Sequence, residues 1–301
     1  MKSQTDFRKL LDPAVVAKLK TLELKAKSVV EGFMVGYHKS PYHGFSSEFS
    51  QHKPYIQGDA IKNIDWKVFA KSEKYFIKQY EEETNLLAHV IIDISKSMEY
   101  KHEAEITKFE YAKILGASLI NLLLKQQDAV GIALYANEVK SYYSPKSKST
   151  YLKTLLTEIE NVKADNITKT SDSLKEIANK VKKRGLVIVI SDFLDDVEEI
   201  LSALKRFQYK KNEVIVFHVL DPIEKNFKFE KDSIFVDMET NEELTTQPIQ
   251  IQRAYVEAMK DYLKSLKTGC NKYGFDYNLI DTTTSFDVAL MSFFKKRARL
   301  N

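Results

Sequence analysis

Short, continuous apolar runs alternate with amphipathic stretches through this chain from about residue 85 onward. The runs have the length of strands and lack polar residues at every second position, which is typical of strands buried on both faces. The stretches between them place apolar residues three and four positions apart, which predicts helices. The alternation therefore predicts an α/β fold with an open, mostly parallel, Rossmann-like sheet and helices on both faces. The predicted strands are residues 86–94, 129–136, 185–190, 213–220, a peripheral 232–238, and 275–281; the predicted helices are residues 103–126, 149–162, 171–184, 196–208, 250–273 and 285–299.

The pattern before Thr84 is different. Residues 12–33 are predicted to form one helix, with Asp12 as its N-cap and Pro13 at its first position. The stretch that follows is rich in Gly, Pro, Tyr and Phe and has short alternating runs, which indicates hairpins and loops. We therefore predict two domains. Residues 1–84 form a small helix plus a β-rich N-terminal region, and residues 85–301 form the sheet domain.

Composition and charge narrow the class of protein. The 301 residues are 44% hydrophobic and 29% charged, which is typical of a soluble globular chain. The formal net charge is only +4, and Lys alternates with Asp and Glu in the N-terminal part, which argues against a nucleic-acid partner. No apolar run approaches the ~20 residues of a membrane span, and the N-terminus lacks the apolar core of a signal peptide. With a single cysteine, Cys270, the chain is predicted to be cytoplasmic.

The sequence HVIIDISKSMEY, residues 89–100, joins a buried strand to a polar ending. Asp93, Ser95 and Ser97 occupy every second position there, and such positions of an extended segment point the same way. Ligands of open α/β sheets bind beyond the carboxyl ends of the strands. Three converging oxygens suit a hard divalent cation such as Mg²⁺, which takes six oxygen ligands. Because serine hydroxyls are neutral, the ion would attract one more carboxylate from outside, which indicates docking rather than hydrolysis.

The residues DISKS resemble the DxSxS metal-ion-dependent adhesion site (MIDAS) motif of von Willebrand factor A (vWA) domains. In that resemblance Asp192, within VIVISDF, matches the distant aspartate of the motif. The loop hydroxyl falls in KTSDSLKEI, where Thr170 or Ser171 matches; Ser171 aligns slightly better because Asp172 follows it, and the usual glycine is missing. The resemblance therefore implies Mg²⁺, or Mn²⁺ in its place, as the cofactor. The implied ligands are Asp93, Ser95, Ser97, Asp192 and one of Thr170 and Ser171.

Upstream, the segment from residue 40 to residue 83 resembles the DUF58 family, which pairs a Gly-Asp-x-x-x-x-Ile-Asp-Trp element with a vWA-like domain. Residues 58–66 match that element, and VLDPIEKNF and FVDMETNEEL match later segments of the family. The resemblance implies a non-enzymatic, metal-dependent adaptor for protein–protein interaction. Such an adaptor docks an acidic residue of a partner protein and acts with a MoxR-type AAA+ ATPase in a chaperone or assembly role.

Two other interpretations of the same residues exist. A phosphatase or nucleotide hydrolase on a doubly wound sheet would also use an aspartate at the end of the strand. An aspartyl-phosphate phosphatase, however, has a second Asp where this chain has Ser95, and no G-x-x-x-x-G-K-[ST] or G-x-S-x-G motif is present. In the structural interpretation DISKS is a polar turn, and Asp192 caps the helix from residue 196, a role for which Asp195 is the better candidate. Asp221, before Pro222, is predicted to be a turn residue outside the site.

Overall fold

The chain divides into two compact units, residues 1–40 together with 86–301, and residues 41–85. The prediction assigns residues 1–40 to the N-terminal domain, whereas here they belong to the larger unit, because helix α2 (Leu22–His38) packs against α4 (Lys108–Lys125) of the sheet-bearing unit. The computed structural model describes residues 11–38, 53–54, 69–70, 75–77, 86–102, 104–164, 170–229, 233–236 and 243–297.

The described part of the smaller unit contains one pair of strands. β1 (Lys53–Pro54) pairs with β2 (Phe76–Ile77) in antiparallel orientation. The rings of Phe69 and Tyr75 stack with centroids 4.5 Å apart. The Gly-Asp-x-x-x-x-Ile-Asp-Trp element at residues 58–66 lies outside the described residues.

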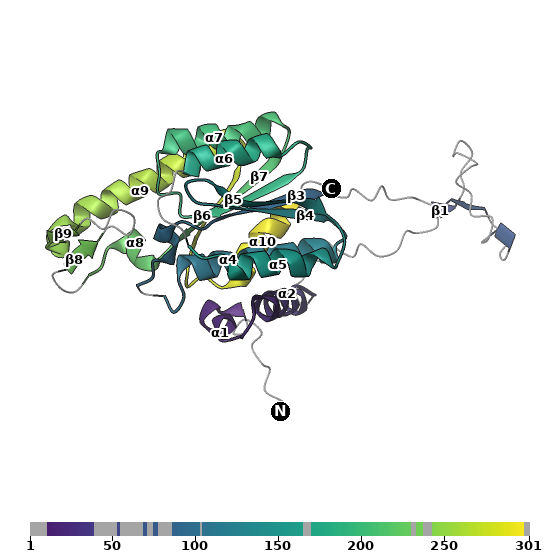
Figure 1. The fold of residues 1–301 in the computed structure, drawn as a ribbon, viewed down its shortest axis with the longest axis horizontal. Coiled ribbons are helices and arrows are strands. Elements are labelled where there is room, and N and C mark those ends of the chain that lie inside the picture. The colour runs from purple at the N-terminus through teal and green to yellow at the C-terminus, as the bar shows by residue number, and fades with distance from the viewer. Residues whose placement is uncertain are drawn as a thin grey trace, which may run out of the picture. The chain divides into compact units, whose positions relative to one another are not determined.

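A six-stranded sheet forms the centre of the larger unit (Figure 1). The strand order is β10-β7-β6-β3-β4-β5, and all neighbours are parallel except β4 and β5. The inner strands are buried almost throughout, as their continuous apolar runs require. The predicted fold class is therefore confirmed. The strands are β3 (Leu87–Asp93), β4 (Ala129–Tyr135), β5 (Val139–Lys146), β6 (Leu186–Ser191), β7 (Glu213–Leu220) and β10 (Asp276–Asp281).

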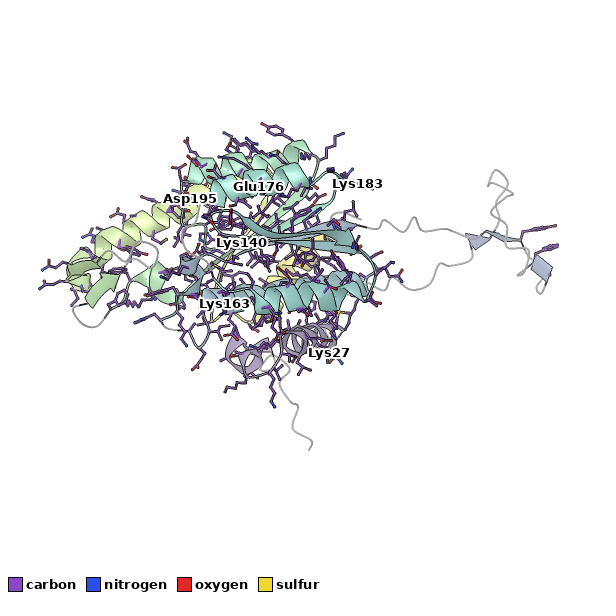
Figure 2. The ribbon with its side chains drawn as sticks, viewed as in Figure 1. Lys27, Lys140, Lys163, Glu176, Lys183 and Asp195 are labelled. Atoms are coloured by element: carbon purple, nitrogen blue, oxygen red, sulfur yellow. The ribbon has the colours of Figure 1, made fainter. Side chains whose placement is uncertain are left out.

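Helices cover both faces of the sheet (Figure 1). One face is covered by α6 (Thr170–Lys180), α7 (Val197–Tyr209) and the C-terminal part of α9 (Pro248–Lys272), whose apolar side chains share one buried cluster with the sheet. The other face is covered by α4, α5 (Tyr151–Asn161) and α10 (Phe286–Arg297), with α2 packed outside α4. Charged side chains such as Lys27, Lys140 and Glu176 come from the outer surfaces of separate elements (Figure 2). Among the described residues, no helix has both the length and the apolar character that a membrane crossing requires.

The N-terminal helix differs from the single helix predicted for residues 12–33. Asp12 is the N-cap as predicted, and its Oδ1 accepts a hydrogen bond from the Ala14 N–H at 2.8 Å. The first helix, α1 (Pro13–Ala17), nevertheless ends after one turn. The hydroxyl of Thr21 accepts a hydrogen bond from the Leu24 N–H at 3.3 Å and so begins α2 as a separate helix. A second capping residue, Thr21, in the middle of the helical pattern is the physical reason for the break.

A short, unpredicted helix follows β7. Asp221 is the N-cap of α8 (Pro222–Asn226) and forms a capping box with Glu224, so it is a helix cap rather than a simple turn residue. The predicted peripheral strand is β8 (Ser233–Val236), and it pairs with an unpredicted partner, β9 (Glu243–Thr246), outside the main sheet.

The chain order places a switch point between β3 and β6. From β3 the chain continues to β4 and β5 on one side, and then returns to β6 on the other side of β3. Open α/β sheets bind ligands outside the carboxyl ends of strands at such a point. The polar residues that follow β3 and β6 therefore meet at the position where a binding site is expected.

Candidate functional site

Asp93 ends β3 and is completely buried. Its two carboxylate oxygens accept hydrogen bonds from different strands: Oδ1 from the Ser95 N–H at 2.9 Å, and Oδ2 from the Ser191 hydroxyl at 2.6 Å. The second bond joins the ends of β3 and β6 directly. Asp93 is thus held in place on both sides, and it orients the chain from which Ser95 projects.

The two serines of DISKS meet by a different route from the one predicted. The chain does not stay extended; it turns after Ser95 into a single 3₁₀ turn, Lys96–Glu99. This turn still brings the Ser95 and Ser97 hydroxyl oxygens to 3.0 Å from each other. Ser97 Oγ also donates a hydrogen bond to Asp192 Oδ2 at 2.9 Å. The prediction of converging oxygens holds for this pair, but the cause is the turn rather than strand alternation.

Asp192 comes from the loop after β6 and is 1% exposed. The next residue, Phe193, is buried and has a φ of 47°, in the left-handed region that few side chains adopt. The Tyr262 hydroxyl of α9 donates to the carbonyl oxygens of Phe193 and Asp195 and holds this loop. Asp192 does not cap the following helix. Asp196 is that cap, instead of the predicted Asp195, because its Oδ1 accepts from the Glu199 N–H at 2.9 Å.

Lys108 is a member of the site that the sequence did not reveal. Its side chain is fully buried, and its Nζ lies 2.8 Å from Asp192 Oδ2 and 2.6 Å from Glu224 Oε1. Lys108 follows the N-cap Thr107, in the first turn of α4, where the helix dipole disfavours a cation. A cation in the first turn was the one signal available in the sequence.

The buried charges influence each other's pKa values. Burial would raise the pKa of Asp192, but the charge and hydrogen bond of Lys108 hold it below its ordinary value. Burial would likewise lower the pKa of Lys108, but Asp192 and Glu224 keep it above its ordinary value. Among the described residues no cation pairs with Asp93 in this way, and burial together with the charge of Asp192 raises its pKa to about 7. An additional cation near Asp93 and Asp192 would relieve that repulsion.

The structure distinguishes between the two candidate loop ligands. The Ser171 hydroxyl points to α7 and donates to Glu199 Oε2 at 2.8 Å. Thr170 Oγ1 is buried and forms no hydrogen bond of standard geometry with the described residues; the same is true of the Tyr135 hydroxyl at the end of β4, which lies near Thr170. Burial raises the pKa of Tyr135 well above its ordinary value, and Asp93 raises it further, which places this phenol beside the carboxylates. Thr170 is therefore the better candidate ligand.

The assembled oxygens are suitably spaced for a small octahedral cation. Neighbouring ligands at about 2.1 Å from Mg²⁺ lie about 3.0 Å apart, and the Ser95–Ser97 and Ser97–Asp192 separations are 3.0 and 2.9 Å. Thr170 adds a buried hydroxyl. Within the described ranges, no group of three or more His, Cys, Asp or Glu could hold a metal ion. The donor set is instead hydroxyl-rich, with Asp192, now paired with Lys108, as its carboxylate, and donors of this kind suit Mg²⁺ or Mn²⁺.

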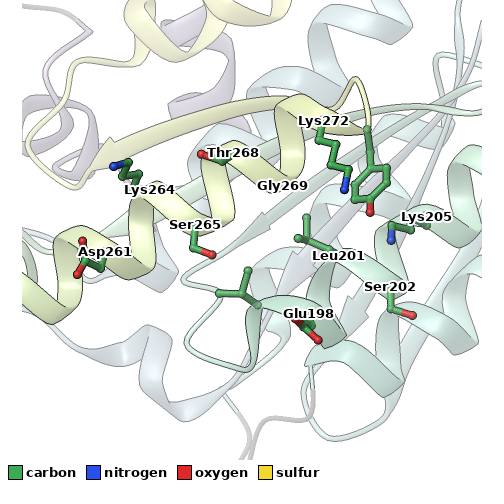
Figure 3. Close-up of a pocket in the computed structure, with 12 residues that line it drawn as sticks. Glu198, Leu201, Ser202, Lys205, Asp261, Lys264, Ser265, Thr268, Gly269 and Lys272 are labelled. Atoms are coloured by element: carbon green, nitrogen blue, oxygen red, sulfur yellow. The ribbon is translucent and has the colours of Figure 1, made fainter.

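A separate groove of about 740 Å³ lies between α7 and α9 (Figure 3). Its lining carries both signs of charge: three lysines, Lys205, Lys264 and Lys272, and two carboxylates, Glu198 and Asp261. The ammonium of Lys205 already lies 3.8 Å from the centroid of the Tyr273 ring. None of the candidate metal ligands lines this groove, so it is distinct from the site at the ends of β3 and β6.

A family model described as "Protein of unknown function DUF58" matches residues 51–264, more than two thirds of the chain. The chain belongs to the DUF58 family. The predicted membership is thereby confirmed, and the matched range includes both strand ends, the loop before α6 and helix α8. Every candidate metal ligand therefore lies in the part that this DUF58 protein shares with its family.

Curated relatives of this DUF58 protein come from mycobacteria. The chain is 27% identical over 234 residues to the uncharacterized protein Mb1516 of Mycobacterium bovis and equally to the uncharacterized protein Rv1480 of Mycobacterium tuberculosis. The alignments cover 76% of this chain and 72% of each relative. The names of these relatives state no activity.

Several solved structures are similar at low sequence identity. BatB from Bacteroides thetaiotaomicron has a TM-score of 0.43 and 17% identity, over 71% of this chain and 98% of that one. An aerotolerance-related membrane protein from Bacteroides fragilis has a TM-score of 0.44 and 18% identity, over 69% and 98%. The SpRpn10 VWA domain has a TM-score of 0.40 and 12% identity, over 68% and 94%. All three TM-scores lie below 0.5. The fold is therefore defined by the strand order and register of the sheet itself.

Proposed function

We propose that this DUF58 protein is a non-enzymatic adaptor that docks an acidic residue of a partner protein through Mg²⁺, or Mn²⁺ in its place. The observation that carries the proposal is the convergence of the Ser95, Ser97 and Asp192 oxygens, with Ser97 Oγ 3.0 Å from Ser95 Oγ and 2.9 Å from Asp192 Oδ2, together with the buried hydroxyl of Thr170 at the start of α6. The residue-level roles follow from their contacts. Ser95, Ser97, Thr170 and Asp192 would hold the ion, and Asp93 would orient the turn.

The charge balance supports docking rather than hydrolysis. Both oxygens of Asp93 are occupied by hydrogen bonds from the protein, which leaves Asp192, now paired with Lys108, as the carboxylate that would hold the ion. One carboxylate and several neutral hydroxyls do not neutralise a dication, so the ion supplies a Lewis acid for an external carboxylate. That carboxylate would be an Asp or Glu of the partner. A hydrolase would instead need further anionic ligands and a positioned base.

The metal-binding part of the proposal predicts different effects for neighbouring hydroxyls. Ser97→Ala and Thr170→Val should each weaken Mg²⁺ binding about tenfold or more, because each removes one oxygen from the shell. Ser171→Ala should bind as the wild type does, since its hydroxyl faces Glu199. Isothermal titration calorimetry with MgCl₂ on the full chain measures all three. Equal affinity in the Ser97, Thr170 and Ser171 variants would remove the metal site.

We further propose that the partner complex contains a MoxR-type AAA+ ATPase and that the adaptor has a chaperone or assembly role. Tagged wild-type protein should recover the ATPase from native cells in buffer with Mg²⁺, and EDTA or Ser97→Ala should reduce the recovery several-fold. Mass spectrometry identifies the recovered protein, and circular dichroism checks that the variant is folded. ATPase recovered equally well in EDTA would show that the metal is not the docking point. Turnover of a generic phosphate ester by the purified protein would instead support the hydrolase alternative.

A further inference from the structure

Lys108 places a positive charge inside the candidate site. The side chain is fully buried, and its ammonium contacts Asp192 Oδ2 at 2.8 Å and Glu224 Oε1 at 2.6 Å. Removing an ammonium from water is costly, so such a group must be compensated by charged partners. The start of α4 cannot help, because the helix dipole is positive there. The two carboxylates therefore keep the charge of Lys108 in the interior.

One oxygen has two roles in this arrangement. Asp192 Oδ2 accepts a hydrogen bond from Ser97 at 2.9 Å and also faces the Lys108 ammonium. A dication held by Asp192 and Ser97 would come within a few ångströms of that ammonium. Cations repel each other strongly at this separation in a buried, weakly polar environment. Lys108 and a dication would therefore compete for the same carboxylate, that of Asp192.

Glu224 is the second counterion of the Lys108 ammonium. Its Oε2 accepts a hydrogen bond from the Asp221 N–H at 2.7 Å, as part of the capping box of α8. Its Oε1 is the atom that Lys108 contacts. Because the capping box fixes this carboxylate independently of Asp192, Lys108 keeps a counterion when Asp192 turns to another cation. Only a small movement of the lysine end is needed.

We propose that Lys108 competes with a divalent cation for Asp192: its ammonium pairs with Asp192 until the ion displaces it, and it then keeps Glu224 as its counterion. This inference rests on the metal-dependent docking proposed above. Competition lowers the affinity of the site for the ion alone. A partner carboxylate then adds the negative charge that overcomes the repulsion between Lys108 and the ion. Ion and partner therefore bind cooperatively, each more tightly in the presence of the other.

Removing the ammonium tests the competition directly. Lys108→Met keeps an unbranched side chain but removes the ammonium. The variant should bind Mg²⁺ at least about tenfold more tightly than the wild type, because the repulsion between the ammonium and the ion is absent. Lys140→Met, which changes an exposed lysine on β5, is the matched control and should equal the wild type. Calorimetry with MgCl₂ and no partner measures the three affinities. An affinity of Lys108→Met that is equal to or below that of the wild type overturns the inference.

A measurement on the wild type covers the case in which Lys108→Met fails to fold. The ¹⁵N resonance of the Lys108 ammonium reports its hydrogen-bond partners. It should shift on addition of Mg²⁺, with the same half-saturation as the calorimetric titration. A resonance that stays fixed while calorimetry shows binding overturns the inference.

The outcomes separate this inference from the docking proposal. Mg²⁺ binding to Lys108→Met but not to the wild type supports competition in its strongest form. Equal binding to both proteins removes the competition and leaves the metal site. Absence of binding in both, with an unchanged Lys108 resonance, removes the metal site and the competition together.

Discussion

Asp192→Ala should lower the free energy of unfolding by about 3 kcal/mol in metal-free buffer, because it removes one of the two carboxylates that compensate the buried Lys108 ammonium. The Lys108 ammonium would keep only Glu224 of the two carboxylates that it contacts now. The loss therefore does not depend on a bound ion. Urea denaturation at pH 7 with EDTA, followed by circular dichroism, measures it.

Ser97→Ala is the matched control for this prediction. It removes a hydrogen bond to the same Asp192 oxygen but no charge, so it should cost about 1 kcal/mol. Both variants should bind Mg²⁺ more weakly than the wild type, and their stabilities should differ. If Asp192→Ala is no less stable than Ser97→Ala, then Lys108 does not depend on Asp192 for its burial.

Gly185→Ala should destabilise the protein by about 3 kcal/mol or more, at the upper end of the cost of overpacking. Gly185 precedes β6, and a Cβ built there would lie 2.0 Å from the backbone carbonyl oxygen of Leu87 in β3. Neither backbone can move without disturbing the pairing of β3 with β6. Chemical denaturation shows the effect as a lower midpoint with an unchanged slope.

Gly274→Ala provides a control with a different physical cause. Gly274 has a φ of +71°, but a Cβ there would meet no atom within 4 Å. The expected loss is about 1 kcal/mol, from backbone strain without a clash. An equal loss in the two variants would mean that the contact between Gly185 and β3 relaxes freely.

The sequence predicted the sheet because its signal is local. Continuous apolar runs such as those of β3 and β6 need burial on both faces, and a parallel sheet between helices provides it. The nearness of Asp93 and Asp192 follows from the same pattern, because the carboxyl ends of parallel strands meet at one edge. The detailed geometry around these two aspartates could not be predicted from the same pattern. The 3₁₀ turn after Ser95 and the left-handed Phe193 depend on contacts with distant parts of the chain.

Other features could not be predicted from the sequence for physical reasons. Lys108 has the sequence character of an exposed helical residue, and its burial arises only because the loop after β6 and helix α8 converge on it. The choice between Thr170 and Ser171 depends on the rotation of one helical turn, which no spacing rule fixes. The break between α1 and α2 depends on whether Thr21 caps a helix or continues one.

The outermost strand β5 has a consequence for how the protein associates with others. This edge strand contains Lys140, Pro145 and Lys146, and a proline offers no N–H to a further strand. Lysines along an edge strand also repel a second copy of the same strand. These features disfavour edge-to-edge aggregation through β5, even at high protein concentration. The addition of a foreign strand along β5 is disfavoured for the same reason.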